Sequence, residues 1–278
     1  MLPKATMKLS CFADEISPLI FEQLGVMRDL GIRRMAFRSA WDMGVLEMNV
    51  QLLKEIHHQL AWEGVEVSCV GSAVGKIALD QSTQAEKAQM ESAIQAADLL
   101  GTDRIRGFTF FPGQRDRDAC LNEVIDRIAA LTAMAKAAGK TLLLECERDV
   151  IADNSQRLRR VLEGVNDSAC LAVLDASNCL SVGENPFKES LPRLAPFLCD
   201  VHVKDSRRGG AEKVPPGQGE AKWPELIRAL KDYDGLCLTL EPHLTCGGLL
   251  RGFSGEAGFR LATQALTELL EAENIECE

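Results

Sequence analysis

The sequence predicts a (β/α)8 barrel, and three observations support this fold class. Short apolar runs rich in leucine and valine alternate with longer amphipathic segments throughout the 278 residues, as in folds where helices cover a buried parallel sheet. Glycine recurs where these helices are expected to end. Eight such units fill about 250 residues, the usual size of one barrel. An open doubly wound sheet is the alternative, but no G-x-G-x-x-G motif follows the first expected strand.

The expected elements alternate strictly between strand and helix. Strands are expected at residues 7–13, 33–39, 65–71, 104–111, 141–147, 169–175, 199–205 and 236–242. Helices are expected at residues 18–30, 46–63, 83–100, 118–138, 155–164, 186–196, 224–233 and 257–273. The first helix has a favourable start, because Ser17 can cap its amide groups and Pro18 suits the first helical position.

Six glycines mark expected helix ends, because the residue after a helix commonly adopts the left-handed conformation that glycine tolerates best. They are Gly31, Gly64, Gly101, Gly139, Gly164 and Gly235. One junction in the series has no glycine. We place it near Pro196, since proline can also stop a helix.

Composition indicates one water-soluble domain spanning residues 1–278. The chain is 46% hydrophobic and contains no Pro/Ser-rich linker, so a single large core is expected. It shows neither a signal peptide nor an apolar stretch of membrane-spanning length, and its ten cysteines are scattered without a C-x-x-C pair. We therefore expect reduced thiols, a cytoplasmic location and no membrane partner.

The charge balance bears on the class of partner. Thirty-one basic and 41 acidic residues give a net charge of −10, which disfavours binding to a nucleic acid polyanion. We expect a small molecule as the partner, and a homo-oligomer remains open.

Four apolar runs in the second half of the chain contain or end in residues that can bind a hard divalent metal. The runs cover residues 141–145, 171–175, 200–203 and 238–241. Their candidate ligands are separated by 30, 27 and 39 residues, about one strand–helix unit each, and are Glu145, Asp175, His202 and Glu241. The carboxyl ends of parallel strands meet on one rim of a barrel, so we expect these side chains to converge there.

Side-chain alternation along the strands supports this convergence. The valines on either side of His202 are expected to face the outer helices, which leaves His202 and Lys204 facing the barrel interior. The same alternation places Glu241 and His243 inside. Three carboxylates around one imidazole repel each other unless they are paired. One divalent cation resolves this repulsion, and an oxygen-rich set with one nitrogen suits Mn²⁺, Mg²⁺ or Co²⁺. The alternative is that the acids pair with arginines.

Seven short motifs occur in order along nearly the whole chain. They are FADEIS at 12–17, RSAW at 38–41, GSAVGK at 71–76, LECE at 144–147, VHVKD at 201–205, PGQGE at 216–220 and LEPHL at 240–244. Together they resemble the sugar phosphate isomerase/epimerase family of the xylose isomerase-like TIM barrel superfamily, which also includes endonuclease IV.

The resemblance implies a role for each residue of the quartet. In that superfamily the residues at the matching strand ends bind one divalent metal ion, which here implies Glu145, Asp175, His202 and Glu241 as ligands. In its ketose epimerases two glutamates also act as acid and base on opposite faces of the sugar, which implies Glu145 and Glu241 as catalytic residues. Metal binding to a carbonyl and a neighbouring hydroxyl would acidify the carbon between them and stabilise an enediolate.

Two positions depart from the family pattern. Ala36 stands where many relatives have a glutamate, and Asn178 stands where many have a histidine. An amide can hydrogen-bond a hydroxyl group, but it cannot replace imidazole as a base or a nitrogen ligand. We therefore expect the chemistry to differ in part from that of a standard epimerase.

Five residues near the expected rim are candidates for substrate contact. Lys204 suits an oxyanion or a phosphate, and His243 suits a hydroxyl group or a proton. Arg38 and Lys76 suit an anionic or polyhydroxylated substrate, and the fifth candidate is Asn178. A structural ion pair or hydrogen bond is the alternative for these residues. The loop at 206–219 is rich in glycine and basic residues, and is expected to be either a lid over the site or a mobile surface loop.

The leading functional hypothesis is a metal-dependent sugar isomerase or epimerase that transfers a proton next to a carbonyl. A lyase, dehydratase or hydratase acting on a keto-sugar is the alternative, because it begins with the same proton abstraction. An endonuclease IV-like phosphodiesterase is less well supported, since it would need several histidine ligands and the chain has only four histidines. A non-enzymatic sugar-binding module would not need paired glutamates.

Overall fold

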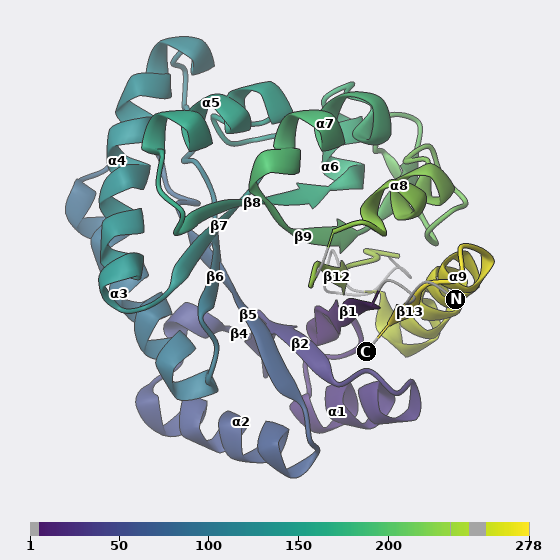
Figure 1. Cartoon of the computed structure of the whole chain (residues 1–278). Helices are drawn as coiled ribbons and strands as arrows, with labels where there is room; N and C mark the ends of the chain where they lie inside the picture. The colour runs from purple at the N-terminus through teal and green to yellow at the C-terminus, as the bar shows by residue number, and fades with distance from the viewer. Residues whose placement is uncertain (1–5, 234, 245–253, 278) are drawn as a thin grey trace.

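The computed structural model describes residues 6–233, 235–244 and 254–277. Besides one short strand at the edge of its main sheet, eight parallel strands close into a barrel (Figure 1), because the last of them pairs with the first. In order around the barrel they are β1 (Thr6–Cys11), β2 (Arg34–Phe37), β5 (Glu66–Val74), β6 (Arg104–Gly107), β7 (Thr141–Glu145), β8 (Cys170–Asp175), β9 (Leu198–Val203) and β12 (Cys237–Leu240). The pairing of β12 with β1 confirms the (β/α)8 barrel and excludes the open sheet.

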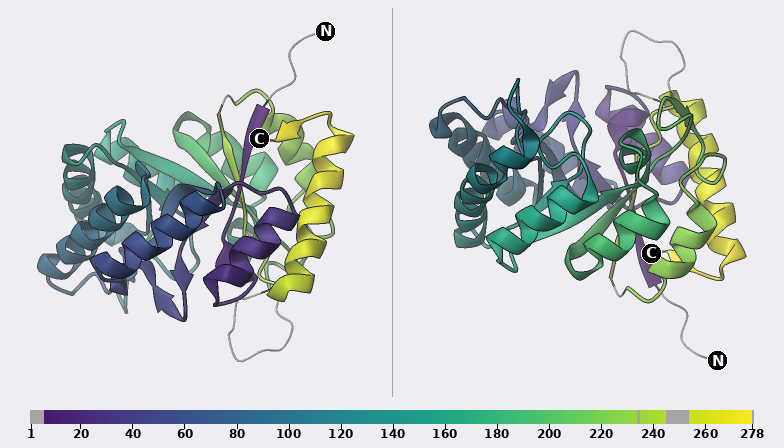
Figure 2. Two further views of the ribbon diagram at one scale, coloured as in Figure 1. Left: turned by 90° about the horizontal axis from the view of Figure 1, so that it is seen from below. Right: turned by 90° about the horizontal axis from the view of Figure 1, so that it is seen from above.

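Helices surround the barrel on the outside, as the side views in Figure 2 show. They are α1 (Ile20–Asp29), α2 (Val50–Trp62), α3 (Thr83–Leu100), α4 (Arg117–Ala137), α5 (Ser155–Val165), α6 (Ala176–Ser181), α7 (Leu191–Leu194), α8 (Trp223–Leu230) and α9 (Gly255–Ala272). The first and last long helices lie beside each other, because Arg260 of α9 forms an ion pair of 2.7 Å with Asp29 of α1. None of the described helices is long and apolar enough to cross a bilayer.

Several short elements were not predicted, because they are too brief to show a periodic pattern. They are the antiparallel hairpins β3 (Ser39–Ala40) with β4 (Met43–Gly44) and β10 (Asp205–Arg207) with β11 (Glu212–Val214), the turns η1 (Ala13–Glu15) and η2 (Val45–Glu47), and the strand β13 (Glu276–Cys277), which pairs with β1. The helix expected at 186–196 is divided into η3 (Pro186–Ser190), α7 and η4 (Ala195–Phe197). Of these, η1 and the β10–β11 hairpin carry residues of the site described below.

The predicted start of the first helix is wrong by two residues. Helix α1 begins at Ile20, and its N-cap residue is Leu19, which has no capping side chain. Ser17 instead accepts a hydrogen bond from the Leu19 amide (3.1 Å) and donates one to Glu22. The serine therefore forms a local turn before the helix, as serine side chains often do.

The glycine pattern is confirmed at four of its six positions, where the glycine caps a helix or follows its cap. Five of the six glycines have a left-handed backbone, with φ between 67° and 76°, and they are Gly31, Gly64, Gly101, Gly139 and Gly235. Gly235 is left-handed, but α8 ends at Leu230, so this glycine lies in the turn before β12. Gly164 is the exception, because it lies inside α5 and Asn166 (φ 46°) ends that helix. A Cβ atom at residue 164 would lie 2.6 Å from the Ile125 side chain of α4. This glycine therefore serves helix packing. The junction without glycine does lie near Pro196, since η4 ends at Phe197 and β9 follows.

The barrel has an outer core under the helices and a smaller inner core. The outer core includes Val201 and Val203, both fully buried, as strand alternation predicts. The inner core consists of Phe12, Ala36, Cys69, Leu143 and Val173. These side chains form an apolar layer inside the barrel. The described cysteines form no disulfide.

Candidate active site

The four predicted ligands converge at the C-terminal ends of neighbouring strands. Glu145 and Asp175 are the last residues of β7 and β8, His202 lies in β9, and Glu241 follows β12. Asp175 is the register partner of His202 across the β8–β9 pair. Each residue offers one ligand atom, and these atoms all lie within 4.8 Å of one another. The side chains are all buried, so the sequence prediction of their convergence is confirmed.

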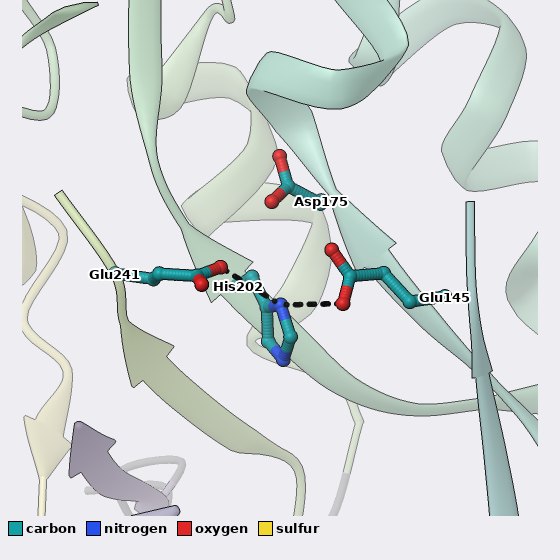
Figure 3. Close-up of side chains that lie close together, drawn as sticks. All are labelled: Glu145, Asp175, His202 and Glu241. Atoms are coloured by element: carbon teal, nitrogen blue, oxygen red, sulfur yellow. Dashed lines mark ion pairs between the residues drawn. The ribbon is translucent and has the colours of Figure 1, made fainter. Parts of the chain in front are cut away.

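His202 occupies the centre of this quartet. Its Nδ1 atom lies 3.5 Å from Glu145 Oε2 and 3.3 Å from Glu241 Oε2, with the two carboxylates on opposite sides of the ring (Figure 3). The ring of Phe12 packs edge-on against the imidazole, with centroids 5.1 Å apart. Burial alone would lower the pKa of His202, but the charges of Glu145 and Glu241 raise it to about 10.

Glu145 is surrounded by hydrogen-bond donors. Its Oε2 atom accepts a hydrogen bond from the Arg106 guanidinium (3.2 Å), and its Oε1 atom accepts one from the side-chain amide of Asn178 (2.9 Å). Burial favours the neutral carboxyl group, but the neighbouring His202 and Arg106 outweigh burial and lower the pKa of Glu145 to about 2. Glu145 is therefore ionised throughout the neutral pH range.

Glu241 is ionised for a related reason. Its Oε1 atom lies 2.5 Å from Arg38, and its Oε2 atom lies 3.2 Å from Lys204 Nζ. Burial favours protonation, but Lys204 and His243 hold the pKa of this carboxyl group well below its usual range. Lys204 also lies 2.6 Å from Asp175 Oδ2. The alternative expectation, that the acids pair with arginines, is therefore met for Glu241, which pairs with Arg38, and for Glu145, which pairs with Arg106. Asp175 pairs with a lysine instead.

The quartet fits a hard divalent metal ion. Asp175 Oδ1 accepts the backbone N–H of Asn178 at the start of α6 (2.8 Å), while Asp175 Oδ2 faces Lys204 Nζ and His202 Nδ1 faces the carboxylates of Glu145 and Glu241. Three buried carboxylates so close together repel one another, and a divalent cation among them would offset that repulsion. The four ligand atoms lie close enough together for one small cation to be held by all of them. Three carboxylates and one imidazole are a suitable donor set for Mn²⁺, Mg²⁺ or Co²⁺.

The five predicted substrate-contact residues line a cavity of about 850 Å³ at this end of the barrel, here called the rim cavity. Several of them already have protein partners. Arg38 binds Asp14 (2.7 Å), Lys76 binds Glu147 (2.5 Å) and His243 Nδ1 lies 2.7 Å from Glu15. The remaining two, Asn178 and Lys204, contact the quartet directly. The rim cavity therefore places these five side chains beside the quartet.

Sequence reasoning missed four residues of this site. Asp14 and Glu15 lie in η1 and bind Arg38, Arg106 binds Glu145, and Lys213 lines the rim cavity from β11. Strand alternation could have identified Arg106, because Ile105 faces the outer core and its neighbours must face inward. Asp14 and Glu15 lie just after the first expected strand (residues 7–13), close to the kind of position that drew attention to the quartet.

The segment at 206–219, expected to be a lid or a mobile loop, is organised by one buried carboxylate. Asp205 accepts backbone N–H groups from Ser206 (2.8 Å), Gly217 (2.9 Å), Gly219 (2.9 Å) and Ala221 (3.1 Å). These bonds tie both ends of the segment together around the β10–β11 hairpin. The contacts favour a fixed wall of the rim cavity.

Replacing Asp205 by alanine is expected to loosen this wall. A hydrogen bond to a charged group contributes about 1.5–3 kcal/mol, so amide hydrogen exchange at Gly217, Gly219 and Ala221 should accelerate about 10-fold or more. The exposed Asp149→Ala variant is the control and should leave these amides unchanged. Unchanged exchange in Asp205→Ala would show that other contacts hold the segment.

Comparison with known proteins agrees with the fold and places the chain in a family. The model of the xylose isomerase-like TIM barrel family matches residues 24–269. The IolI protein with a bound zinc atom superposes with a TM-score of 0.78 at 16% identity, covering 96% of this chain and 99% of that one. D-Psicose 3-epimerase with D-tagatose from Clostridium cellulolyticum H10 gives 0.75 at 15% identity, covering 98% and 100%.

A third solved structure belongs to a protein with a different named activity. It is the probable 3-DHS dehydratase AsbF from Bacillus anthracis, with a TM-score of 0.72 at 17% identity, covering 94% of this chain and 99% of that one. Identities this low establish a common fold and leave the reaction open. Because the family model spans most of the sequence, the chain belongs to the xylose isomerase-like TIM barrel family.

Proposed function

We propose that this chain is a divalent-metal-dependent enzyme that transfers a proton next to the carbonyl group of a sugar or sugar derivative, as an isomerase or epimerase. The observation that carries this proposal is the placement of Glu145 and Glu241 on opposite sides of one centre, at similar distances from His202 (Figure 3). The fold shared with a D-psicose 3-epimerase supports it.

Glu145, Asp175, His202 and Glu241 would hold the metal ion, which would supply positive charge to stabilise the negative charge that develops on the substrate oxygens. The Asp175 carboxylate is held in position for this role, because its Oδ1 atom accepts the backbone N–H of Asn178 and its Oδ2 atom forms an ion pair with Lys204. The apolar layer containing Phe12 closes the site from below, which limits the access of water.

The two glutamates would carry the proton. One carboxylate would remove the proton from one face of the substrate carbon, and the other would return a proton on the opposite face. Both line the rim cavity, so a bound sugar can reach each of them. Lys204 and Arg38 pair with Glu241 and keep it ionised, as a base must be before it accepts a proton.

Solvent deuterium uptake tests this function directly. Metal-free protein would be loaded with Mn²⁺, Mg²⁺ or Co²⁺ and incubated in D₂O with a panel of ketoses and keto-sugars. Deuterium is expected at the carbon next to the carbonyl in at least one substrate. If metal is shown to be bound and no member of a broad panel exchanges, the proposal is wrong.

A lyase or dehydratase acting on a keto-sugar is the second candidate. Two observations favour it. The fold is shared with a probable dehydratase, and Ala36, which stands where many relatives have a glutamate, packs in the inner apolar layer. The first proton transfer is the same, so the mass of the product separates the two reactions. Loss or gain of water supports the lyase, and unchanged mass supports the isomerase.

Metal binding is expected to release a proton from His202. Its raised pKa of about 10 means that the imidazole is charged at pH 7 in the metal-free protein, whereas a metal ligand must be neutral. Calorimetry in two buffers of different ionisation enthalpy should therefore show about one proton released per Mn²⁺ at pH 7. Affinity for Mn²⁺ should increase as the pH rises toward 10.

In the metal-free protein, the contribution of His202 to stability changes with pH in the opposite direction to the metal affinity. A pKa raised from 6.5 to about 10 stabilises the fold fully below pH 6.5, and this contribution is lost as the pH rises through 10. For the calorimetric measurement of proton release, the control is the His58→Gln variant, which replaces an exposed histidine of α2 and should release the same number of protons as the wild type. Mn²⁺ binding without proton release would show that His202 is neutral or is not a ligand.

A further inference from the structure

Lys213 differs from the other cations of the rim cavity. Arg38, Lys76, Arg106 and Lys204 each form an ion pair with a carboxylate. Lys213 has no acidic partner among the described residues. Its Nζ atom instead donates to Ser177 Oγ (2.6 Å) and to the backbone oxygen of Gly210 (3.0 Å).

This arrangement leaves the lysine incompletely satisfied. An ammonium group has three N–H donors, and the two neutral acceptors use only two of them. Lys213 is half-buried, so its charge is also removed in part from water. Burial, and then the nearby charge of Lys204, lower the pKa of Lys213. An anion placed against the remaining N–H group would relieve both costs.

The backbone that carries Lys213 is held firmly against α6. Ser206 of β10 hydrogen-bonds Ser177 of α6 (2.9 Å between the hydroxyl oxygens). Gly210 adopts a left-handed backbone (φ 90°), and a Cβ atom there would lie 2.8 Å from the Ser181 side chain. Only glycine allows so close an approach. The lysine is therefore positioned in advance, as a binding residue needs to be.

We propose that Lys213 binds an anionic group of the substrate, a carboxylate or a phosphate ester, so that the enzyme acts on an acidic sugar derivative. This inference rests on the proposed function, in which the quartet acts on the carbonyl end of the same substrate. Lys213, Asn178 and Glu241 line the same rim cavity, so one molecule can contact the lysine and the quartet together. The cavity volume of about 850 Å³ is within the usual range for small-molecule sites.

Binding of three matched probes tests the proposal. The probes share one six-carbon ketose chain and differ at the end remote from the carbonyl group. D-Fructose is uncharged there, D-fructuronate carries a carboxylate and D-fructose 6-phosphate carries a phosphate. Calorimetric titration of the Mn²⁺-loaded protein should show at least one acidic probe binding about 10-fold or more tightly than D-fructose. The preferred acidic probe identifies carboxylate or phosphate as the recognised group.

Substitution of the lysine then locates the effect. A hydrogen bond to a charged group contributes about 1.5–3 kcal/mol, so Lys213→Met should weaken the preferred acidic probe about 10- to 100-fold and leave D-fructose unchanged. Lys213→Arg keeps the charge and should retain most of the affinity. Lys54→Met removes an exposed lysine of α2 and is the matched control.

Two results would overturn the role of Lys213. In the first, measured on wild-type protein alone, no acidic probe binds more tightly than D-fructose. In the second, Lys213→Met weakens the binding of acidic and neutral probes equally. Deuterium exchange is judged separately. Exchange of neutral ketoses with no preference for acids would reject the anion site and keep the enzyme, whereas lysine-dependent binding without exchange in any probe would keep the anion site and reject proton transfer.

Discussion

Glutamine at Glu145 or Glu241 is expected to reduce turnover by about 10²- to 10⁴-fold or more even at saturating Mn²⁺. Glutamine keeps an oxygen donor and nearly the same volume but removes the charge and the basicity. General acid–base catalysis contributes a factor of this size. The measurement is turnover of a substrate found by deuterium exchange, with metal occupancy determined on the same samples.

Asp175→Asn provides the comparison for this prediction. Asp175 contacts Lys204 and caps α6, whereas the two glutamates lie on either side of His202. Because Asp175 is not expected to transfer a proton, excess Mn²⁺ should recover part of the activity of the Asp175→Asn variant. Full recovery of both glutamate variants by added metal would contradict the two-base mechanism. It would leave the metal ion as the main catalyst, with Glu145 and Glu241 as ligands only.

Replacing Arg127 by methionine is expected to destabilise the fold by about 3–5 kcal/mol, the usual cost of removing one partner of a buried ion pair. Arg127 of α4 binds the buried Glu86 of α3 (2.7 Å from Nε) and the backbone oxygens of Leu79 and Gln81. Its guanidinium also lies 4.5 Å from the centre of the Phe110 ring. Urea unfolding with native activity measured in parallel tests this prediction.

Two further variants separate the buried pair from a general effect of losing arginine. Arg159 forms an ion pair with Glu163 in which both side chains are about half exposed, so Arg159→Met should change stability by no more than about 0.5 kcal/mol. Combining Arg127→Met with Glu86→Leu should restore part of the loss, because no buried charge remains unpaired. Equal losses for Arg127→Met and Arg159→Met would contradict the argument.

The barrel and the quartet were predictable because both depend on local and repeating rules. A strand–helix unit has a characteristic length, and parallel strands direct their carboxyl ends to one rim. Side-chain alternation then assigns His202 to the interior and Val201 to the outer core, as the structure shows. These rules need no knowledge of which strands are neighbours, so the sequence alone determined the fold class and the candidate metal ligands.

The tertiary structure decided which other groups meet these ligands. Arg106 reaches Glu145 across 39 positions, and Arg38 reaches Glu241 across 203. Gly164 fits the side chain of Ile125 on a neighbouring helix. No local pattern encodes such contacts, because they depend on the closure of the barrel and on the packing of its loops.

Lys213 shows the difference most clearly. Its sequence surroundings are those of an ordinary basic loop, and its neighbours Ser177 and Gly210 are ordinary residues. Only the folded chain shows that Asp205 fixes the hairpin and that this lysine enters the rim cavity without a carboxylate partner among the described residues. The sequence by itself determined which residues meet at the rim of the barrel, whereas three-dimensional packing determined which charges around them are already neutralised, because charge pairing depends on distance in space.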